Sequence, residues 1–347
     1  METLALFANS KLSIPSTTAW YLDSLGQFRG KQELYTRQSA QALRSLREHS
    51  IIESAISSNR IEGVSIDPAR LQGVLVAGTP LFRNRDEEEI RGYRDALSWV
   101  HERPSEIPLD ESTIKRLHAM ARGQISDAGQ YKEKDGDIVV RHADGRECIR
   151  FKPTPAKEAA AAMDQLIGVW NQCAREQWTP PAVALAAFNL DFLCIHPFRD
   201  GNGRVSRLAL LLLTYHAGME VGRYISLERL IEQNKDRYYE TLEQCSVGWH
   251  EGTHDPWPYI NYLLSILKIA YQEFEERVGQ IVEPKGAKAE LVRHAVRNRR
   301  GEFRLSDIEQ ACPSVGREWI RKVLGDMRKA GELQCKGRGP AARWRAP

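Results

Sequence analysis

The 347-residue sequence lacks an apolar run approaching the roughly 20 residues that a membrane-spanning helix requires. Its first residues, METLALFANSKLSIP, contain no basic leader followed by a long apolar core, so we expect no signal peptide. The six cysteines are scattered and form no C-x-x-C pair, which disfavours both disulfides and a zinc site. These absences predict a globular, cytoplasmic protein with no membrane segment, in which thiols such as that of Cys194 are packed rather than reactive.

The net charge of +3 conceals an uneven distribution along the chain. Residues 284–347 hold 16 Lys and Arg residues against 7 Asp and Glu residues, whereas residues 1–283 hold 33 against 39. This asymmetry predicts a separate basic module at the C-terminal end.

A polar loop between two apolar helical segments, at about 181–195 and 205–217, dominates the sequence. Pro197 cannot continue the first helix, and Gly201 and Gly203 allow a tight turn whose amides can form an anion nest. The loop and the start of the second helix read His196-Pro197-Phe198-Arg199-Asp200-Gly201-Asn202-Gly203-Arg204-Val205-Ser206-Arg207.

The charges of this loop indicate a phosphate ligand. Arg204 and Arg207 share a face of the first helical turn, where two cations oppose the helix dipole. A bound polyphosphate explains them, because arginine matches phosphate oxygens with paired donors. Asp200 offers a carboxylate suited to Mg²⁺, and His196 can accept a proton near neutral pH. The alternative is a Gly-rich interhelical turn with solvated charges, which a lone G-N-G would favour and the full string disfavours.

The full string resembles the Fic family signature, HPFx[D/E]GNGRxxR, at every fixed position, and the likeness extends more loosely over residues 50–270. The resemblance implies a mostly α-helical bundle that moves AMP from ATP to a Ser, Thr or Tyr hydroxyl of a target protein. By the same resemblance His196 is the general base and Asp200 holds Mg²⁺ on the phosphates. The implied ATP-binding residues are Gly201, Asn202 and Gly203 as an anion hole, Arg204 and Arg207 toward the β and γ phosphates, the adjoining Val205 and Ser206, and Tyr239 near the adenosine.

A second motif lies upstream, at the end of a helix expected over residues 46–63. Ser58-Asn59-Arg60-Ile61-Glu62-Gly63 resembles the Fic inhibitory motif, [S/T]xxxE[G/N]. The resemblance implies that Glu62 pairs with Arg207 and so occupies the arginine meant for the γ phosphate, with Ser58 in the same regulatory motif. Two alternatives stay open: Glu62 is a tolerated exposed residue, or it positions a water for removal of AMP.

Two short β-like runs, 138–141 and 149–151, flank the turn signal Ala143-Asp144-Gly145. In an otherwise helical chain this hairpin resembles the Fic flap, which aligns a target segment as an added strand. The alternative is a simple surface hairpin.

Several stretches carry plainer expectations. Helices are predicted over 17–47, 226–244 and 256–282, and His118 is expected to be a packing or surface residue. The acidic run from Asp86 to Glu89 is interpreted as a solvated helix face.

The C-terminal module follows the linker Pro284-Lys285-Gly286. Three helices, at 287–298, 305–312 and 316–330, precede two short strands around a Gly-rich turn, an order that resembles a winged helix-turn-helix. The resemblance implies either DNA binding or protein contacts, including a homodimer.

The sequence therefore predicts an N-terminal helical region (1–105), a Fic core (106–283) and a winged-helix-like basic domain (284–347). The leading hypothesis is an autoinhibited protein adenylyltransferase with ATP and Mg²⁺. The alternatives are a de-AMPylating or bifunctional Fic enzyme, and a DNA-binding transcriptional regulator with a nucleotide-sensing Fic domain.

Overall fold

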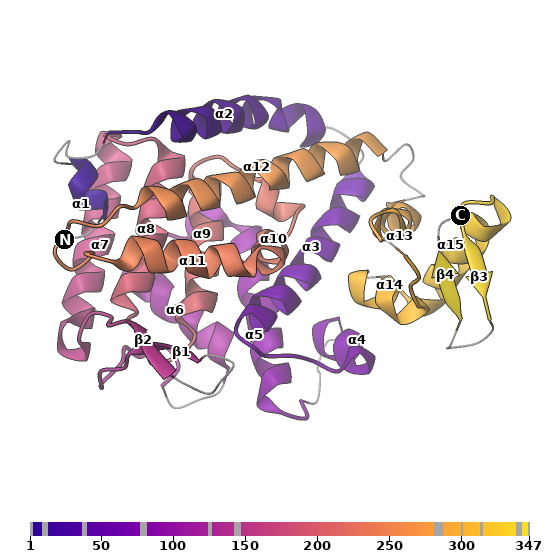
Figure 1. The fold of residues 1–347 in the computed structure, drawn as a ribbon, viewed down its shortest axis with the longest axis horizontal. Coiled ribbons are helices and arrows are strands. Elements are labelled where there is room, and N and C mark those ends of the chain that lie inside the picture. The colour runs from indigo at the N-terminus through magenta and orange to yellow at the C-terminus, as the bar shows by residue number, and fades with distance from the viewer. Residues whose placement is uncertain are drawn as a thin grey trace.

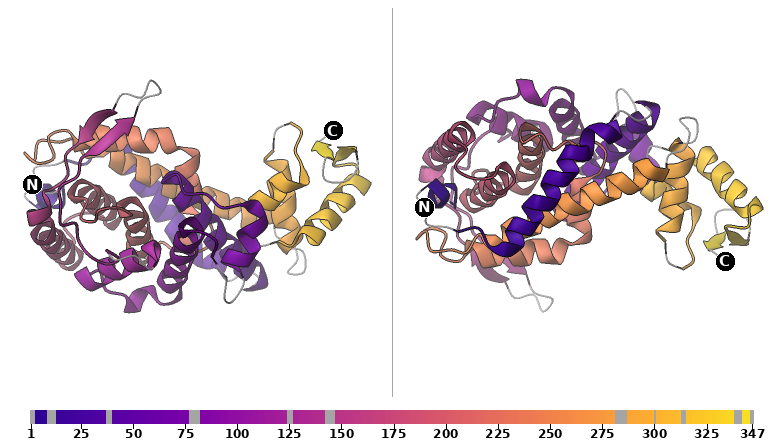
Figure 2. Two further views of the ribbon diagram at one scale, coloured as in Figure 1. Left: turned by 90° about the horizontal axis from the view of Figure 1, so that it is seen from below. Right: turned by 90° about the horizontal axis from the view of Figure 1, so that it is seen from above.

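Helices make up most of the chain, as the sequence predicts, and the strands form only two small sheets. The computed structural model describes residues 3–8, 13–36, 40–76, 82–123, 127–141, 147–280, 287–299, 301–312, 315–337 and 342–345. Figures 1 and 2 show a large helical body with a smaller C-terminal part at one end. Within the described residues, no helix is long and apolar enough to cross a membrane.

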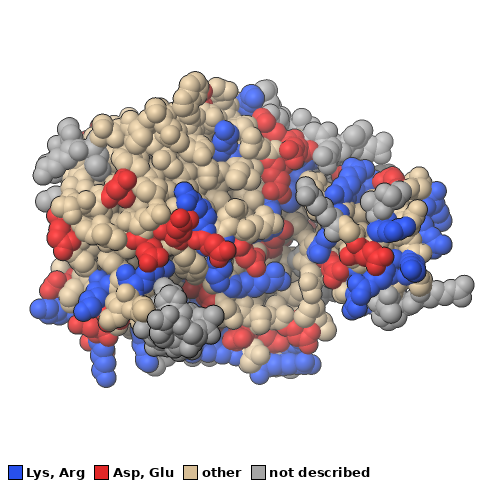
Figure 3. Space-filling view, in the orientation of Figure 1, with Lys and Arg blue, Asp and Glu red and all other residues tan. Residues whose placement is uncertain are grey.

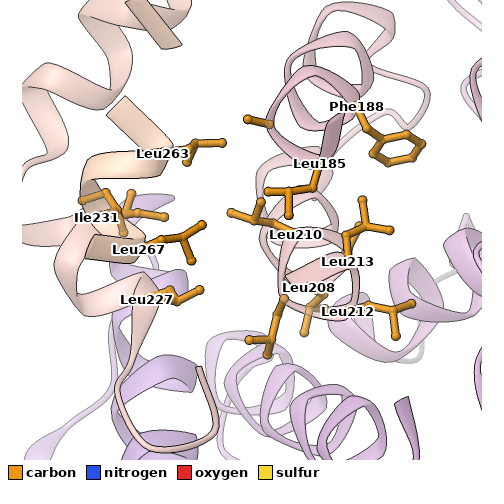
Figure 4. Packing of buried hydrophobic residues seen from close by; sticks show 14 of the residues in the cluster. Leu185, Phe188, Leu208, Leu210, Leu212, Leu213, Leu227, Ile231, Leu263 and Leu267 are labelled. Carbon is orange, nitrogen blue, oxygen red and sulfur yellow. The ribbon is translucent and has the colours of Figure 1, made fainter. Parts of the chain in front are cut away.

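The two most apolar helices form the centre of the body. α8 (Pro181–Ile195) is buried at every residue after the first, and α9 (Asn202–His216) is buried along almost its whole length. A helix that is apolar on all sides must be covered on all sides. Figure 4 shows this packing, with side chains of α8 and α9 facing leucines and an isoleucine from two further helices. The loop joining α8 to α9 therefore starts and ends in rigid core.

The remaining helices of the body surround this pair. They are α1 (Thr3–Ala8), α2 (Ser16–Thr36), α3 (Ala40–Ile61), α4 (Leu71–Leu75), α5 (Arg85–Glu102), α6 (Glu111–Arg122), α7 (Ala156–Glu176), α10 (Leu227–Gln233), α11 (Lys235–Ser246) and α12 (Trp257–Gln280), with 3-10 turns at Pro68–Arg70, Pro104–Glu106 and Val221–Arg223. Side-chain caps fix two of the starts: Asn84 accepts from the amide of Glu87 at 3.0 Å, and Asp110 accepts from that of Thr113 at 2.7 Å.

Two predicted helix boundaries are wrong. Over the stretch expected as a helix at 17–47 the structure has α2 up to Thr36 and α3 from Ala40, with 37–39 outside the described residues. α3 thus begins six residues before the predicted start at 46. The helix expected over 226–244 breaks at Asn234, whose φ of −119° and ψ of 32° are not helical. Asn234 instead caps α10 with its own amide, and its side chain donates to the carbonyl of Leu230 at 2.9 Å. The helix expected over 256–282 is α12, which begins and ends within two residues of the prediction.

The predicted hairpin is present. β1 (Ile138–Arg141) and β2 (Glu147–Phe151) are antiparallel, with Val139 opposite Ile149 and a register shift between Ile138 and Val139. Val139 and Ile149 are 50% and 54% exposed, so the hairpin leaves an apolar face in solvent. The turn expected at 143–145 lies outside the described residues.

The C-terminal part has its own hydrophobic core, which includes Val292, Phe303 and Leu324. An isolated β-bridge joins Phe303 to Trp344, so a strand-like segment lies between its first two helices. Its elements are α13 (Ala287–Arg297), α14 (Leu305–Ala311), α15 (Arg317–Lys329), β3 (Gln334–Lys336) and β4 (Arg343–Arg345), with β3 and β4 antiparallel. The three predicted helices are found, while the division of the chain into three domains stays a prediction.

Candidate active site

His196 ends α8 in a left-handed backbone conformation, with φ 51° and ψ 60°. Its ring Nδ1 lies 3.2 Å from the carbonyl oxygen of Leu193. Because a carbonyl oxygen only accepts, Nδ1 carries the proton of the neutral ring and Nε2 keeps a free lone pair. Burial, which outweighs the Leu193 hydrogen bond, lowers the pKa of His196 to about 4. At neutral pH the side chain is therefore an uncharged base.

The loop after His196 is held by hydrogen bonds within itself. Asn202 Oδ1 accepts from the amide of Phe198 at 2.9 Å, and Asn202 Nδ2 donates to the Phe198 carbonyl at 2.8 Å. Asp200 Oδ1 accepts from the amide of Gly201 at 2.6 Å. Gly201 has φ 81°, and a Cβ there would lie 2.8 Å from the side chain of Arg122, so only glycine fits. Asn202 thus shapes the loop with its side chain.

His118 supports the loop from α6. Its ring stacks on Phe198 at 3.8 Å between centroids and 3° between planes. Nε2 lies 3.0 Å from the carbonyl oxygen of Asp200, and the amide of Gly129 donates to Nδ1 at 2.8 Å. Burial, partly offset by the Asp200 hydrogen bond, lowers the pKa of His118 to about 4, so the neutral ring with Nε2–H satisfies both partners. The packing expectation for His118 is right, and the loop contact adds to it.

Lys132 supports the loop from the other side. Its amide donates to the carbonyl of Pro197 at 2.8 Å, and its Nζ lies 3.3 Å from the carbonyl oxygen of Ile195. These two carbonyls flank His196 in the chain. Lys132 is 8% exposed and lowers the pKa of His196 by its charge.

Arg207 of α9 is hydrogen-bonded to residues at the end of α3. Its Nη2 donates to Glu62 Oε1 at 2.7 Å and to the Ser58 carbonyl at 2.9 Å, and its Nε donates to Ser58 Oγ at 2.8 Å. Although burial alone would lower it, the charge of Glu62 raises the pKa of Arg207 above its usual value. The predicted pairing of Glu62 with Arg207 is thus present as a contact. Nη1 of Arg207 is buried and has no hydrogen-bond partner among the described residues.

Glu62 also lies directly against the loop glycine. A Cβ built on Gly203 would stand 2.1 Å from Glu62 Oε1 and 3.1 Å from Arg207 Nη1. The carboxylate therefore fits beside the start of α9 only because residue 203 has no side chain. The side chain of Glu62 remains 31% exposed, so it borders solvent rather than the core.

Arg204 sits in a buried ion-pair cluster. Its Nη1 lies 2.6 Å from Glu89 Oε2, and Arg122 Nη1 lies 2.8 Å from Glu89 Oε1 and 2.7 Å from Asp200 Oδ2. Although burial alone would raise it, the charges of Arg122 and Arg204 lower the pKa of Asp200 below its usual value. The interpretation of the acidic run as a solvated face is wrong for Glu87 and Glu89, both 3% exposed, because each pairs with an arginine.

Two cavities meet at His196. The first, of about 620 Å³, is also lined by Glu62, Gly203, Tyr239 and Arg150 of β2. The second, of about 770 Å³, runs along the segment from Asp127 to Ile138 that precedes the hairpin. Both are bordered by Ile138, so the hairpin and His196 divide them. A donor molecule in one cavity and an acceptor in the other would meet at the base.

Tyr239 lines the first cavity, and its place near a bound nucleoside stays a prediction. Its hydroxyl is 3.4 Å from the carbonyl oxygen of Ile61, and the guanidinium of Arg150 lies 5.6 Å from its ring centre. Val205 and Ser206 are fully buried, and Ser206 Oγ donates to the Gly203 carbonyl at 2.8 Å. These two predicted ATP-binding residues therefore shape the first turn of α9, and neither side chain lines the cavity.

Sequence reasoning missed four residues that hold the site: Glu89, Arg122, His118 and Lys132. All four lie outside the motif, and their roles depend on tertiary contacts that no local pattern records. Glu89 gave one signal, because it lies four residues before Tyr93 on the same helix face, and Tyr93 is buried. The catalytic, nucleotide and metal roles of the motif residues stay predictions.

Comparison with known proteins matches one segment of the chain to a protein family and the whole fold to solved structures. Residues 108–214 match the model of the Fic/DOC family. A Fic family protein from Desulfovibrio desulfuricans G20 is similar over 97% of each chain, with 21% identity and a TM-score of 0.62. A Fic domain containing signaling protein from Bacteroides thetaiotaomicron VPI-5482 is similar over 74% of this chain and 97% of that one, with 23% identity and a TM-score of 0.60. Fic-1 from C. elegans covers 74% of this chain over 71% of its own, with 19% identity and a TM-score of 0.57.

Proposed function

We propose that this chain, a Fic family protein by the match over residues 108–214, transfers AMP from ATP to a protein hydroxyl and is restrained by Glu62. The observation that carries the proposal is the state of Arg207, a buried cation beside the loop that is held by Glu62 at 2.7 Å. A buried arginine with an unpartnered Nη1 fits an anionic ligand such as a phosphate.

His196 supplies the base of the reaction. Nε2 accepts the proton of a target Ser, Thr or Tyr hydroxyl, and that oxygen attacks the α phosphorus of ATP. The new P–O bond forms as the bond to pyrophosphate breaks, and the imidazolium later gives its proton to solvent. The amides of the loop and the positive end of α9 stabilise the charge that develops on the phosphate. Because the ring is uncharged at neutral pH, no proton has to be removed before the attack.

Mg²⁺ fits the donors that Asp200 offers. The Asp200 side chain is 59% exposed, and a single carboxylate combined with substrate phosphates is a usual way for proteins to hold this ion. Bound there, Mg²⁺ would neutralise phosphate charge. The positive charge of Arg122 lowers the pKa of Asp200 and so favours the ionised carboxylate. The contact of 2.7 Å between Arg122 and Asp200 Oδ2 also fixes the orientation of that carboxylate.

Glu62 restrains transfer by taking the place of a phosphate. Its carboxylate occupies both the Nη2 donor of Arg207 and the space beside Gly203. ATP that enters the cavity then lacks the arginine that would fix its γ phosphate. An error of about 1 Å in the position of the α phosphorus costs much of the rate. Removal of the Glu62 side chain frees Arg207 and should raise transfer strongly.

The test is incubation of wild type and Glu62→Gly with Mg²⁺ and α-labelled ATP, with label on protein as the readout. Glu48→Gly, at an exposed position of the same helix, controls for the effect of glycine on α3. We expect label mainly with Glu62→Gly, and none when His196→Ala is added. No label with any variant, although ATP binds, would reject AMP transfer and favour removal of AMP, with Glu62 positioning a water.

We also propose that residues 287–345 bind duplex nucleic acid. The order of three helices, a β-bridge after the first, and a final pair of strands is consistent with a winged helix-turn-helix, in which α15 would be the second helix of the motif. One face of α15 buries Ile320, Val323, Leu324 and Met327, and the rest of its surface exposes Arg317, Arg321, Lys322 and Arg328. Figure 3 shows several Lys and Arg side chains on this end of the molecule, with Asp and Glu side chains between them.

Duplex binding is tested with the full chain, a labelled DNA duplex and a series of salt concentrations. We expect affinity to fall as salt rises, because each phosphate contact releases counterions. Arg321→Glu combined with Lys322→Glu should weaken binding at every salt concentration. Glu48→Ala, in the helical body, should leave it unchanged. A chain that binds no duplex at low salt would exclude this function without bearing on AMP transfer.

A further inference from the structure

The inhibitory helix α3 contacts the C-terminal domain with one part and Arg207 with another. His49 and Glu53 line a cleft of about 650 Å³ together with Leu291 and His294 of α13. Glu62 follows Glu53 by nine residues, which is roughly 13 Å along a helix. Figure 1 shows α3 running obliquely through the body with its first turns toward α13. A movement of α13 can therefore shift α3, and with it Glu62, which directly follows the helix.

Leu291 of α13 packs into the hydrophobic core of the body. It is 8% exposed and belongs to the hydrophobic core of the body, whereas its neighbour Val292 is fully buried in the separate core of the C-terminal domain. Adjacent residues of one helix turn thus pack into two different cores. Cys312, just after α14, is 1% exposed and lines the same cleft. The C-terminal domain is docked by a small apolar contact beside the cleft.

Charged side chains under the cleft tie α3 to its neighbours. Arg229 Nε of α10 lies 3.1 Å from Glu53 Oε2, and Arg229 also pairs with Glu273 of α12. Although burial alone would raise it, the charge of Arg229 lowers the pKa of Glu53 far below its usual value. Attraction between such charges weakens when water reaches them, because the effective dielectric constant rises. The Glu53 side chain is 15% exposed in this cleft, so movement of α13 away from it would admit more water and weaken the hold on the middle of α3.

We propose that the C-terminal domain regulates AMP transfer through α3. When the domain is docked, α3 stays in the position where Ser58 and Glu62 hydrogen-bond to Arg207. When the domain is undocked, α3 can shift, and Arg207 is then free to bind nucleotide. A hydrogen bond of 2.7 Å between Glu62 and Arg207 is lost with a shift of about 1 Å, so a small movement of the helix suffices. This inference rests on the proposed function, since it names the regulation of the same site.

The experiment opens the contact and measures both the helix and the reaction. Leu291→Asp in the full chain places a charge in the apolar contact, and Trp319→Asp, at an exposed position of α15, is the matched control. Hydrogen exchange is followed at the amides of Glu62, Gly63 and Val64, which donate to carbonyls at the end of α3. With Leu291→Asp we expect faster exchange there and AMP transfer raised about fivefold or more, the scale of ordinary coupling between sites. Trp319→Asp should change neither quantity.

Combination with Glu62→Gly separates the inference from the function on which it rests. If the C-terminal domain acts through Glu62, Leu291→Asp adds nothing to the transfer rate of Glu62→Gly. If Glu62→Gly transfers no AMP, the proposed function fails, and the exchange rates still decide whether docking holds the end of α3. Unchanged exchange and transfer in a folded Leu291→Asp chain would overturn the inference. Should that variant not fold, Ala295→Arg, which places a long cation in the cleft, is tested by the same two measurements.

Discussion

At the scale of single residues, Glu89 is the side chain on which the arginines of the site depend. It is 3% exposed and accepts from both Arg122 and Arg204, which are themselves buried. Two buried cations share one carboxylate, and Arg122 in turn orients Asp200. A buried pair adds little net stability, but removal of one partner leaves an uncompensated charge.

We therefore predict that Glu89→Ala lowers the free energy of unfolding by about 3–5 kcal/mol. Urea denaturation followed by tryptophan fluorescence measures the change. Glu102→Ala, at the exposed end of the same helix, should alter it by less than about 0.5 kcal/mol. Equal stability of the two variants would mean that water reaches the cluster and that Glu89 does not organise it.

The residues of the motif could be predicted from the sequence because they are contiguous. Fixed spacing places Arg204 and Arg207 on one turn, where two cations oppose the helix dipole and therefore indicate an anionic partner. The supporting residues could not be predicted, because Lys132 and Glu89 reach the loop from elements far away in the chain. Charge in the run Asp86–Glu89 suggested solvent, whereas tertiary pairing with arginine made two of its members part of the core.

At the scale of elements, the hairpin β1–β2 combines an apolar face with unpaired strand edges. Val139 and Ile149 lie opposite each other and are half exposed, although apolar pairs in a stable sheet are usually covered. The hairpin borders both cavities through Ile138. A target segment that adds as a further strand would cover the apolar face and bring its hydroxyl toward His196.

Val139→Pro is predicted to reduce transfer to a target protein at least tenfold in the Glu62→Gly background, because proline removes an amide donor from β1. ATP affinity should stay within twofold, since none of the residues that hold the phosphates changes. Val139→Thr, which keeps the backbone donor, serves as the control. Loss of ATP binding along with transfer would show that the hairpin supports the nucleotide instead.

Helix positions could be read well from periodicity, but breaks without glycine or proline could not. The break at Asn234 lies within a sequence whose apolar spacing continues across it. At Asn234 the side chain competes with the backbone for helical hydrogen bonds, a local effect that periodicity does not record.

At the scale of the whole molecule, buried histidines set the response to acid. Burial is the largest cause in each case, and it lowers the pKa of His101 to about 3 and that of His118, His196 and His254 to about 4. In the unfolded chain a histidine titrates near 6.5, so below that pH the unfolded chain binds protons that the folded chain excludes. Asp191 acts in the opposite direction, because burial raises its pKa to about 6 and the folded chain gains its proton first.

Protonation below pH 6.5 destabilises the folded chain through four histidines and stabilises it through Asp191 alone. The free energy of unfolding should therefore fall as the pH drops from 7.5 to 5. Each histidine contributes up to about 1.4 kcal/mol per pH unit below 6.5, and partial solvation leaves a total on the order of a few kcal/mol. Thermal unfolding of the full chain at the two pH values measures this. A melting temperature that is equal or higher at pH 5 would contradict the assigned histidine burial.

If the chain has the proposed function, restraint and catalysis both depend on Gly203, and this decides which mutations can release the enzyme. Any side chain at 203 would collide with the Glu62 carboxylate and push it away from Arg207. The same side chain would fill the space where the loop amides meet a phosphate, so the released enzyme would have lost its substrate pocket. Mutation at 203 would therefore inactivate the enzyme instead of activating it. A change at Glu62 spares the pocket, so position 62 is where a single mutation yields an unrestrained enzyme.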